Sequence, residues 1–402
     1  MIYRAAVTRA LAAMRCGALT VTLPDGSTVR FGEGENPRRS RYGLDARMRI
    51  VRDLFFARCA RHGDIGLAEG YMAGDWDSDD LAEVIAWFIL NAGEEPRKAK
   101  LADRIRHALR RNSPRNSRRN IADHYDLSND FFAAFLDPSM TYSSALFDDD
   151  PLRTLEAAQE AKFERLCALM ELKEGDRVLE IGGGWGAFSR HAARRYGCHV
   201  TTITISREQF AWADACRRAQ GLEARVDLQL ADYRAVRGRF DKIVSIEMIE
   251  AVGHQYFDTF FARCSALLEP NGLVALQAIV CPEARYETLR RGVDFIQKHI
   301  FPGGLIPSVG ALLASVQRST DFTLRSMGDF GDSYARTLEL WAERFEENRE
   351  RIRALGFDEV FLRKWRYYFS YCLAAFRMRH VSVVQLLLTR PNNHSLQSAV
   401  LR

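Results

Sequence analysis

The sequence predicts an α/β fold with a mostly parallel sheet, preceded by a smaller α+β domain. From Arg177 onward, β-branched runs alternate with segments of helical period, which is typical of a parallel sheet covered by helices. Within that part, Arg177–Gly186 (RVLEIGGGWG) places a buried strand, a tight glycine turn and a helix start in direct succession. Glycines let the backbone approach a ligand closely, because no Cβ stands in the way.

Seven strands are expected in the large sheet. Five follow from short apolar, β-branched runs, at 178–181, 200–205, 228–233, 240–247 and 272–280. A sixth strand is expected at 322–327, and 381–388 is expected to close the sheet as an edge strand.

Polar side chains stand at the carboxyl ends of four of these strands, where ligands of such sheets bind. They are Glu180, Thr204, Asp232 and Glu247, and all of them are able to hold a nucleoside. A dinucleotide is disfavoured, because the acid that it needs at the end of the second strand is absent. S-adenosylmethionine is therefore the favoured ligand of the glycine turn.

Residues 1–95 are expected to form the separate small domain. Leu19–Leu23 and Thr28–Phe31 alternate and flank a turn, which predicts a hairpin. Helical spacing of apolar residues predicts one helix over Asp45–His62 and another over Leu81–Leu90. This part shows no catalytic constellation, so a scaffold or docking role is expected.

Residues 96–119 are predicted to be a basic linker. From Arg97 to Arg119 there are ten Lys or Arg against the single acid Asp103, although the whole chain has a net charge of only +5. Such a run is commonly a solvated linker or helix face. The sharper interpretation is attraction to anionic lipid headgroups, worth on the order of 1 kcal/mol per basic residue near the surface.

Metal, disulfide and membrane-spanning functions are disfavoured. The eight cysteines lie far apart without a Cys-x-x-Cys pair, and His124 and His254 lack partners at metal-ligand spacing. No metal is expected, and the cysteines fit a reducing cytoplasm. Arginines interrupt the N-terminus, so no signal peptide is expected, and Leu81–Leu90 is too short to span a bilayer. Any membrane contact is expected to be peripheral.

Aromatic residues are concentrated around the predicted sheet. Ile121–Phe147 is rich in Phe and Tyr, which either pack in the core or cap a cation such as a sulfonium. Phe295–Ser308 has Pro-Gly-Gly between apolar segments, which is typical of a lid or substrate channel. Tyr334–Leu355 and Asp358–Arg379 are expected to be long helices.

Seven separated stretches follow one another from His124 to Arg379: HYDLSNDFFAAFLDPSMTYSSALF, VLEIGGGWGAF, ITISREQ, FDKIVSIEMIEAVG, FPGGLIPS, SYARTLELWAERF and YYFSYCLAAFRMR. Together they resemble the cyclopropane-fatty-acyl-phospholipid synthases and the related mycolic acid methyltransferases. The N-terminal part also looks like the lipid-side domain of the phospholipid-acting members. The resemblance implies, over 120–402, a Rossmann-like, seven-stranded class I S-adenosylmethionine-dependent methyltransferase domain with a helical lid.

The resemblance implies transfer of a methyl group from S-adenosylmethionine to a cis double bond of an unsaturated phospholipid acyl chain. An alkene is a poor nucleophile, so the sulfonium methyl must be held in line with it in a dry site. The resulting carbocation needs π-faces or carboxylates around it and no water. In this family a bound bicarbonate takes a proton from the added methyl group, and a cyclopropane ring closes.

For the catalytic anion site, the resemblance implies Glu250, Tyr334 and the backbone N–H of Ile279. Ser144 and Gln277 stand where the family has a cysteine and a histidine. Gln277 keeps a hydrogen-bond donor but cannot take up a proton. Relatives with such substitutions include enzymes that make methyl-branched or methylene chains, so this product stays open as the alternative to a cyclopropane.

Cys372 also aligns with a family cysteine. A thiol in an apolar helix is more often a small buried hydrophobe than a nucleophile. No covalent intermediate is needed when an alkene attacks a sulfonium, so a nucleophilic role is disfavoured.

For the cofactor, the resemblance implies residues before the first strand, in the glycine turn, and after the second and third strands. The set comprises Tyr142, Ser143, Glu180, Gly182, Gly184, Gly186, Thr204, Ser206, Gln209, Asp232 and Tyr233. Glu180 is expected to support the turn by accepting backbone N–H bonds. Gly183 replaces a family cysteine at no evident cost.

Two other functions are disfavoured. A catalytically silent lipid-binding protein conflicts with the intact Glu250 and Tyr334, and nucleic-acid methylation lacks the motifs of base methyltransferases. The expected partners are unsaturated phospholipid acyl chains and an anionic membrane surface, not nucleic acid. The expected location is the cytoplasm, at the inner face of the membrane, and the oligomeric state stays open, a homodimer included.

Overall fold

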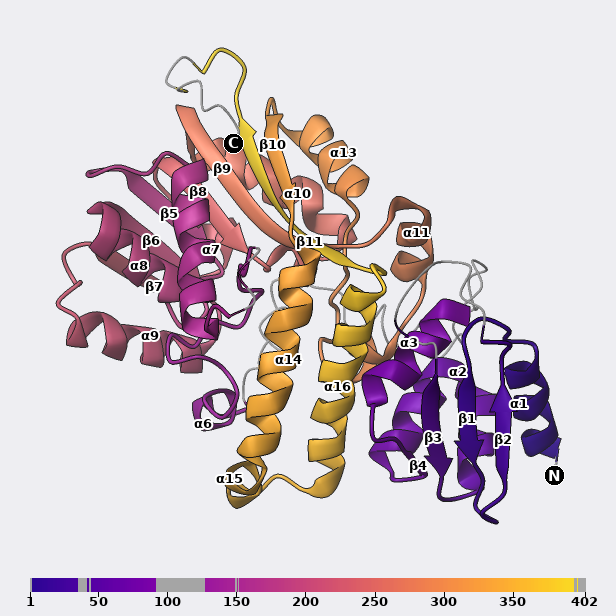
Figure 1. Cartoon of the computed structure of the whole chain (residues 1–402). Coiled ribbons are helices and arrows are strands. Elements are labelled where there is room, and N and C mark those ends of the chain that lie inside the picture. Colours follow the sequence, from indigo (N-terminus) through magenta and orange to yellow (C-terminus); the bar gives the residue numbers. More distant parts are fainter. Residues whose placement is uncertain are drawn as a thin grey trace.

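The computed structural model describes residues 2–34, 42, 45–91, 127–148, 150, 152–393 and 396. Its strands form a four-stranded sheet in the order β2-β1-β3-β4 and a seven-stranded sheet in the order β10-β11-β9-β8-β5-β6-β7 (Figure 1). The predicted α/β fold with a seven-stranded, mostly parallel sheet is confirmed. The predicted basic linker, 96–119, and His124 lie outside the described residues.

The N-terminal unit is built around the four-stranded sheet. β1 and β2 pair antiparallel, with Leu19 opposite Phe31, so the predicted hairpin is confirmed. β3 lies parallel to β1 on its other side and antiparallel to β4. The elements are α1 (Ile2–Ala12), β1 (Leu19–Thr22), β2 (Thr28–Phe31), β3 (Ala46–Ile50), α2 (Leu54–Met72), β4 (Trp76–Asp77) and α3 (Leu81–Asn91).

The helix predicted over Asp45–His62 is wrong in its first part. Ala46, Met48 and Ile50 of β3 are buried and alternate with exposed arginines, and this period of two belongs to a strand. The helix α2 begins only at Leu54, and it continues to Met72 across a kink at Gly63, whose φ is 58°. The segment therefore combines a strand and a helix, and the two periods overlap in the sequence.

The large sheet contains five parallel strands and an antiparallel extension. β7, β6, β5, β8 and β9 run parallel, whereas β11 is antiparallel to both β9 and β10. The carboxyl ends of the parallel strands therefore meet at one edge, where ligands bind in such sheets. The strands are β5 (Arg177–Ile181), β6 (His199–Thr204), β7 (Val226–Leu230), β8 (Phe240–Ile246), β9 (Leu268–Val280), β10 (Thr323–Asp329) and β11 (Ser382–Thr389).

The prediction of an edge strand at 381–388 is wrong. β11 lies between β9 and β10, and all of its residues after Ser382 are buried. The edge is formed instead by β10, whose side chains are mostly exposed. A continuous apolar run is typical of a strand that is covered on both faces, so the VVQLLL pattern itself favours the interior position.

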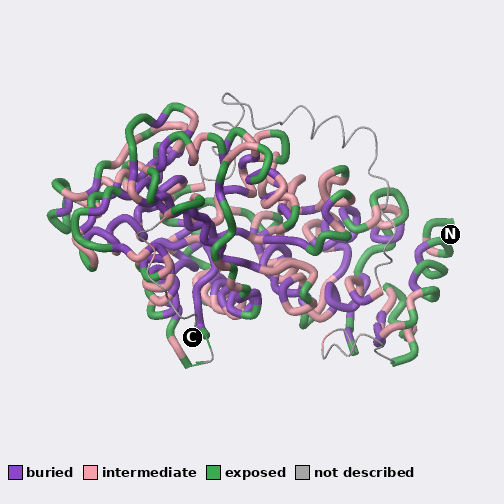
Figure 2. Tube along the Cα trace, turned by 90° about the horizontal axis from the view of Figure 1, so that it is seen from above, coloured by how far each residue is buried: buried purple, intermediate pink, exposed green. Residues whose placement is uncertain are grey.

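Helices cover both faces of the large sheet (Figure 1). α7 (Leu155–Leu169) and α8 (Ala187–Tyr196) share a core with Val178, whereas α10 (Phe257–Leu267) and α13 (Val309–Ser319) share one with Leu179. Consecutive strand residues face opposite sides, which explains this division. Figure 2 shows the buried segments running through the centre of the molecule and the exposed ones on its outer turns. The remaining elements of this part are α6 (Asn129–Phe132), α9 (Arg207–Ala219), η1 (Tyr233–Ala235), η2 (Ile249–Ala251), η3 (His254–Tyr256), α11 (Glu283–Arg291) and α12 (Phe295–His299).

Two long helices near the C-terminus connect the large sheet with the N-terminal unit (Figure 1). They are α14 (Gly331–Glu347) and α16 (Glu359–Arg377), and the short α15 (Arg349–Ala354) lies between them, so the predicted Tyr334–Leu355 helix is divided at Asn348. Arg363 of α16 donates to the carbonyl oxygens of Tyr71 (2.6 Å) and Trp76 (2.9 Å) and pairs with Asp77 (3.1 Å).

The aromatic residues that precede the large sheet pack mainly in the core. Phe131, Phe132 and Phe135 are fully buried, and their ring centroids lie 4.8, 6.1 and 5.7 Å from that of Trp365 in α16. Of the two interpretations of this segment, core packing holds for these three residues, whereas Tyr142 lines a cavity.

Replacing Arg363 with methionine is expected to weaken the contact between α16 and the N-terminal unit. The change removes three hydrogen bonds, so the free energy of unfolding should fall by about 2–3 kcal/mol. Arg353→Met, at an exposed pair with Glu359, is the control and should change it by less than about 1 kcal/mol. Urea denaturation followed by tryptophan fluorescence measures both, and equal effects would contradict the role of Arg363.

Candidate functional site

A large cavity connects the glycine turn with the N-terminal unit. It has a volume of about 1490 Å³, and its wall is mostly apolar. The wall includes Gly182–Gly184, the carboxyl ends of β6, β8 and β9, parts of α14 and α16, and parts of α1, α2 and α3. Pockets for one small ligand usually measure about 300–1,000 Å³. The cavity therefore has room for a cofactor and for a long apolar chain.

The glycine turn follows β5 and forms one wall of this cavity. Gly182, Gly184 and Gly186 have φ values of 87°, 54° and 78°, which favour glycine. A Cβ on Gly182 would lie 2.7 Å from Met248 Cγ, so glycine is also needed there for space. Gly182 and Gly184 line the cavity, whereas Gly186 caps the start of α8.

One expectation for this turn needs correction. Glu180 is expected to accept backbone N–H bonds, but its Oε2 accepts the hydroxyl of Thr202 at 2.6 Å. At Gly183, where the family has a cysteine, a Cβ would overlap the same hydroxyl oxygen, so glycine fits the space left beside Thr202. Thr202 therefore links the two positions. Burial raises the pKa of Glu180 to about 7.

The polar residues predicted beyond the second and third strands divide between the cavity wall and positions behind it. Thr204, Gln209, Asp232 and Tyr233 line the cavity. The hydroxyl of Ser206 instead accepts the backbone N–H of Gln209 (3.3 Å) at the start of α9. The carboxylate, hydroxyl and amide groups on the wall, together with the closely approachable turn, fit the ribose and adenine of S-adenosylmethionine.

Tyr142 and Ser143 lie on the cavity wall between the glycine turn and the buried Lys162. Both line the cavity, and the hydroxyl of Ser143 accepts a hydrogen bond from Lys162 Nζ (2.7 Å). Lys162 is fully buried, and its ammonium lies 4.5 Å from the ring centroid of Phe163. Burial lowers the pKa of Lys162 to about 7, against the opposite effect of the charge of Glu247. Lys162 is not among the predicted site residues, because a lysine within an ordinary helix pattern carries no signal of burial.

Glu247 is the acceptor at the centre of the predicted anion site. Its Oε1 accepts the backbone N–H of Ser144 (2.9 Å) and the side-chain amide of Gln277 (2.8 Å). Its Oε2 accepts the hydroxyl of Tyr334 (2.9 Å). Three of the groups that the resemblance assigns to a bound bicarbonate therefore donate to a carboxylate of the chain itself, and bicarbonate does not fit this donor set.

Glu250 lies beside Glu247, but its carboxyl group forms different hydrogen bonds. Its Oε1 accepts the backbone N–H of Ile279 (2.5 Å), as the assignment of these two positions to one site implies. Its Oε2 is buried without a hydrogen-bond partner among the described residues. Burial raises the pKa of Glu250 to about 8, and the charge of Glu247 adds to this effect.

The structure thus brings Ser144, Gln277, Ile279, Tyr334 and Glu250 together around Glu247. Glu247 is predicted as one of four polar strand ends able to hold a nucleoside, but its carboxylate instead accepts hydrogen bonds from Ser144, Gln277 and Tyr334. Its position three residues before Glu250 in IEMIE is a signal for a carboxyl pair. Cys372 also lines the cavity. Burial raises the pKa of the Cys372 thiol well above its usual value, so this residue is a neutral thiol and a poor nucleophile.

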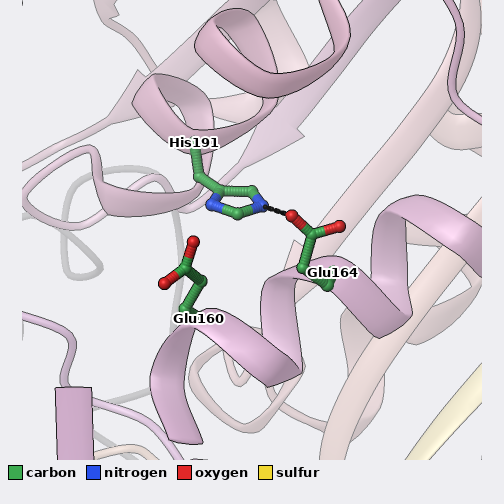
Figure 3. A group of neighbouring side chains, drawn as sticks. All are labelled: Glu160, Glu164 and His191. Carbon is green, nitrogen blue, oxygen red and sulfur yellow. Dashed lines mark ion pairs between the residues drawn. The ribbon is translucent and has the colours of Figure 1, made fainter. Parts of the chain in front are cut away.

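A second group of titratable side chains lies outside the cavity. Glu160 and Glu164 of α7 face His191 of α8, with ligand atoms within 4.8 Å of one another (Figure 3). Glu164 already contacts His191 Nε2 (3.1 Å) and Arg195 (3.2 Å), and it accepts the hydroxyl of Tyr196 (2.5 Å). Burial lowers the pKa of His191, so Arg195 is the charged partner of Glu164, and these contacts account for the arrangement of the group.

Comparison with known proteins relates the chain to a family. The family model described as mycolic acid cyclopropane synthetase matches residues 112–386. A tuberculostearic acid methyltransferase of Mycobacterium tuberculosis is 43% identical over 349 residues, which cover 84% of this chain and 82% of that protein. The cyclopropane-fatty-acyl-phospholipid synthase of Escherichia coli is 36% identical over 391 residues, which cover 94% of this chain and 98% of that protein.

Solved structures agree with this relation. A mycolic acid cyclopropane synthase complexed with S-adenosylhomocysteine has a TM-score of 0.63 and 30% identity, over 68% of this chain and 98% of that one. Its bound ligand is the product form of the cofactor that the glycine turn and strand ends fit. The chain therefore belongs to the mycolic acid cyclopropane synthetase family and is an S-adenosylmethionine-dependent methyltransferase.

Proposed function

We propose that the protein transfers the methyl group of S-adenosylmethionine to a cis double bond of an unsaturated phospholipid acyl chain. The observation that supports this best is the continuous cavity from the glycine turn to the N-terminal unit. Val7, Leu11, Phe55, Ile85 and Phe88 line its far end, and these side chains favour an apolar chain over water. The names of the two relatives, a tuberculostearic acid methyltransferase and a cyclopropane-fatty-acyl-phospholipid synthase, support the same substrate class.

The protein's own residues position the reactants, exclude water and stabilise positive charge. The cofactor supplies an electrophilic methyl group when it is bound. Tyr142 lines the cavity; its hydroxyl donates to that of Tyr368 (2.9 Å), and its ring stacks on Phe301 at 6.3 Å between centroids. Aromatic faces stabilise a nearby cation. A carbocation on the acyl chain is thereby protected from capture by water.

For the product, we propose a cyclopropane, with a methyl-branched or methylene chain as the second candidate. The second candidate is favoured by Gln277 in place of a histidine and by the 43% identity to a tuberculostearic acid methyltransferase. A cyclopropane and a methylene chain both require loss of a proton after methyl transfer. No step is assigned to bicarbonate, because its expected donors are engaged by Glu247.

We further propose that residues 1–95 form a lipid-docking domain and 120–402 the catalytic domain. The basic linker 96–119, outside the described residues, would draw the protein to anionic lipid at the cytoplasmic face of the membrane. Across the described ranges, no helix combines the length and the apolar character needed to cross a bilayer. Contact at the surface is therefore the form of membrane association that we propose.

Incubation with labelled S-adenosylmethionine and an oleoyl or vaccenoyl phospholipid is expected to yield S-adenosylhomocysteine and a methylated lipid. In the proton NMR spectrum of that lipid, cyclopropane methylene signals should lie upfield of all others, and vinylidene signals would instead identify the second candidate. A saturated phospholipid is the control. Cofactor binding without turnover on any unsaturated lipid would contradict methyl transfer and favour a silent lipid-binding protein.

Narrowing the far end of the cavity is expected to impair use of long acyl chains. Ala10 of α1 lines the cavity, whereas Ala12 of the same helix is not part of its wall. Ala10→Trp should lower turnover of oleoyl phospholipid by about tenfold or more without changing the affinity for S-adenosylhomocysteine. Ala12→Trp is the matched control, and equal turnover in both variants would contradict an acyl path along α1.

Reversing the charges of Arg110, Arg111, Arg118 and Arg119 is expected to weaken association with anionic vesicles at low salt, because each basic residue contributes on the order of 1 kcal/mol. Vesicle co-sedimentation measures this. Neutral vesicles and high salt are the controls, since salt screens the attraction. Unchanged partition of the variant would exclude the linker as a docking surface.

A further inference from the structure

We propose that Glu247 is a catalytic residue, the base that accepts the proton released after methyl transfer, at the place where the resemblance puts bicarbonate. This inference rests on the proposed function and identifies the proton acceptor that the methyl transfer requires. Glu247 lines the same cavity as the glycine turn and the apolar path, so its carboxylate has access to a bound acyl chain.

The donors that hold Glu247 come from three separate parts of the fold. Ser144 lies in the segment before α7, Gln277 in β9 and Tyr334 in α14. Gln277 is itself oriented, because its Oε1 accepts the side-chain amide of Gln385 in β11 (3.0 Å) and its NH₂ group therefore faces Glu247. A carboxylate offers the same planar pair of oxygens as bicarbonate. A bicarbonate ion bound to these donors would lie next to the carboxylate of Glu247, and two adjacent negative charges repel each other strongly.

The backbone at Glu247 supports a functional role. Its φ of 49° is unusual for a residue with a side chain, and its N–H donates to the carbonyl oxygen of Gln277 (2.8 Å). Such conformations persist where the surroundings fix them, often at functional sites. Here the conformation directs the carboxylate toward the three donors.

Of the two neighbouring carboxyl groups, Glu247 is the one built to carry the charge. Burial raises the pKa of Glu247, but three hydrogen bonds and the charge of Lys162 act against this effect. Glu250 accepts one, from the backbone of Ile279, and has a buried oxygen without a partner among the described residues. Two adjacent carboxylates do not ionise together easily, so Glu250 holds the proton and Glu247 remains able to accept one.

The proton balance is the same for a cyclopropane and for a methylene chain. The π electrons of the alkene form the new carbon–carbon bond while the sulfur–methyl bond breaks, which leaves S-adenosylhomocysteine and a cation on the acyl chain. A proton then passes from the new methyl carbon to a carboxylate oxygen of Glu247. The electrons of that C–H bond close the cyclopropane, or, after a hydride shift, form a methylene double bond. Glu247 returns its proton to water after the lipid leaves.

Glu247→Gln is expected to lower kcat by about 10²- to 10⁴-fold, the usual contribution of a positioned base, with unchanged affinity for S-adenosylhomocysteine. Glu250→Gln is the matched comparison, because an amide imitates a neutral carboxyl group, and it should retain about tenfold more turnover than Glu247→Gln. The assignment would be overturned if the kcat of Glu247→Gln were close to that of the wild type. It would also be overturned if Glu250→Gln alone had a kcat below that of the wild type.

A measurement on the wild-type enzyme keeps the test independent of how the variants fold. In buffer freed of carbon dioxide, its rate should be the same with and without added bicarbonate. A rate that rises with bicarbonate would overturn the inference. Failure of the wild type to form S-adenosylhomocysteine with unsaturated phospholipid would instead overturn the proposed function, so the two failures are distinguishable.

Discussion

Two carboxyl groups share one buried region, and this constraint determines how the surrounding site is built. Removing a carboxylate from water is costly unless hydrogen bonds and an opposite charge compensate it. Ser144, Gln277 and Tyr334 provide the hydrogen bonds to Glu247, and the buried Lys162 provides the charge. Glu250, with much less compensation, has its pKa raised to about 8. The pair can therefore hold one negative charge in a cavity that also suits a carbocation.

Elements that are far apart in the sequence meet at Glu247 and its hydrogen-bond donors. β11 lies inside the sheet, so Gln385 can orient Gln277, and α14 begins beside β11, so Tyr334 near its start reaches Glu247. Burial and the charge of Glu247 hold the pKa of Tyr334 well above its usual value, and its hydroxyl remains a donor. The helices that line the apolar part of the cavity and the strands that lead into the glycine turn therefore meet at one carboxylate.

Much of the fold could be predicted from local patterns, because the glycine turn and the β-branched runs have strong periodicity. The errors arose where two patterns overlap, as in β3 and α2, or where an apolar run at the C-terminus belongs to an inner strand, as in β11. Most candidate site residues lie on the cavity wall, but Ser206 and Gly186 serve as caps behind it. The central position of Glu247 and the burial of Lys162 could not be predicted, because both depend on contacts between segments far apart in the chain.

With Glu247, the chain supplies its own carboxylate where a bound anion is expected. The most direct test is a crystal structure of the protein with S-adenosylhomocysteine, grown in the presence of bicarbonate. In that structure, both carboxylate oxygens of Glu247 should accept the hydrogen bonds of Ser144, Gln277 and Tyr334. Bicarbonate bound to these three donors, with the side chain of Glu247 turned away from them, would contradict this expectation.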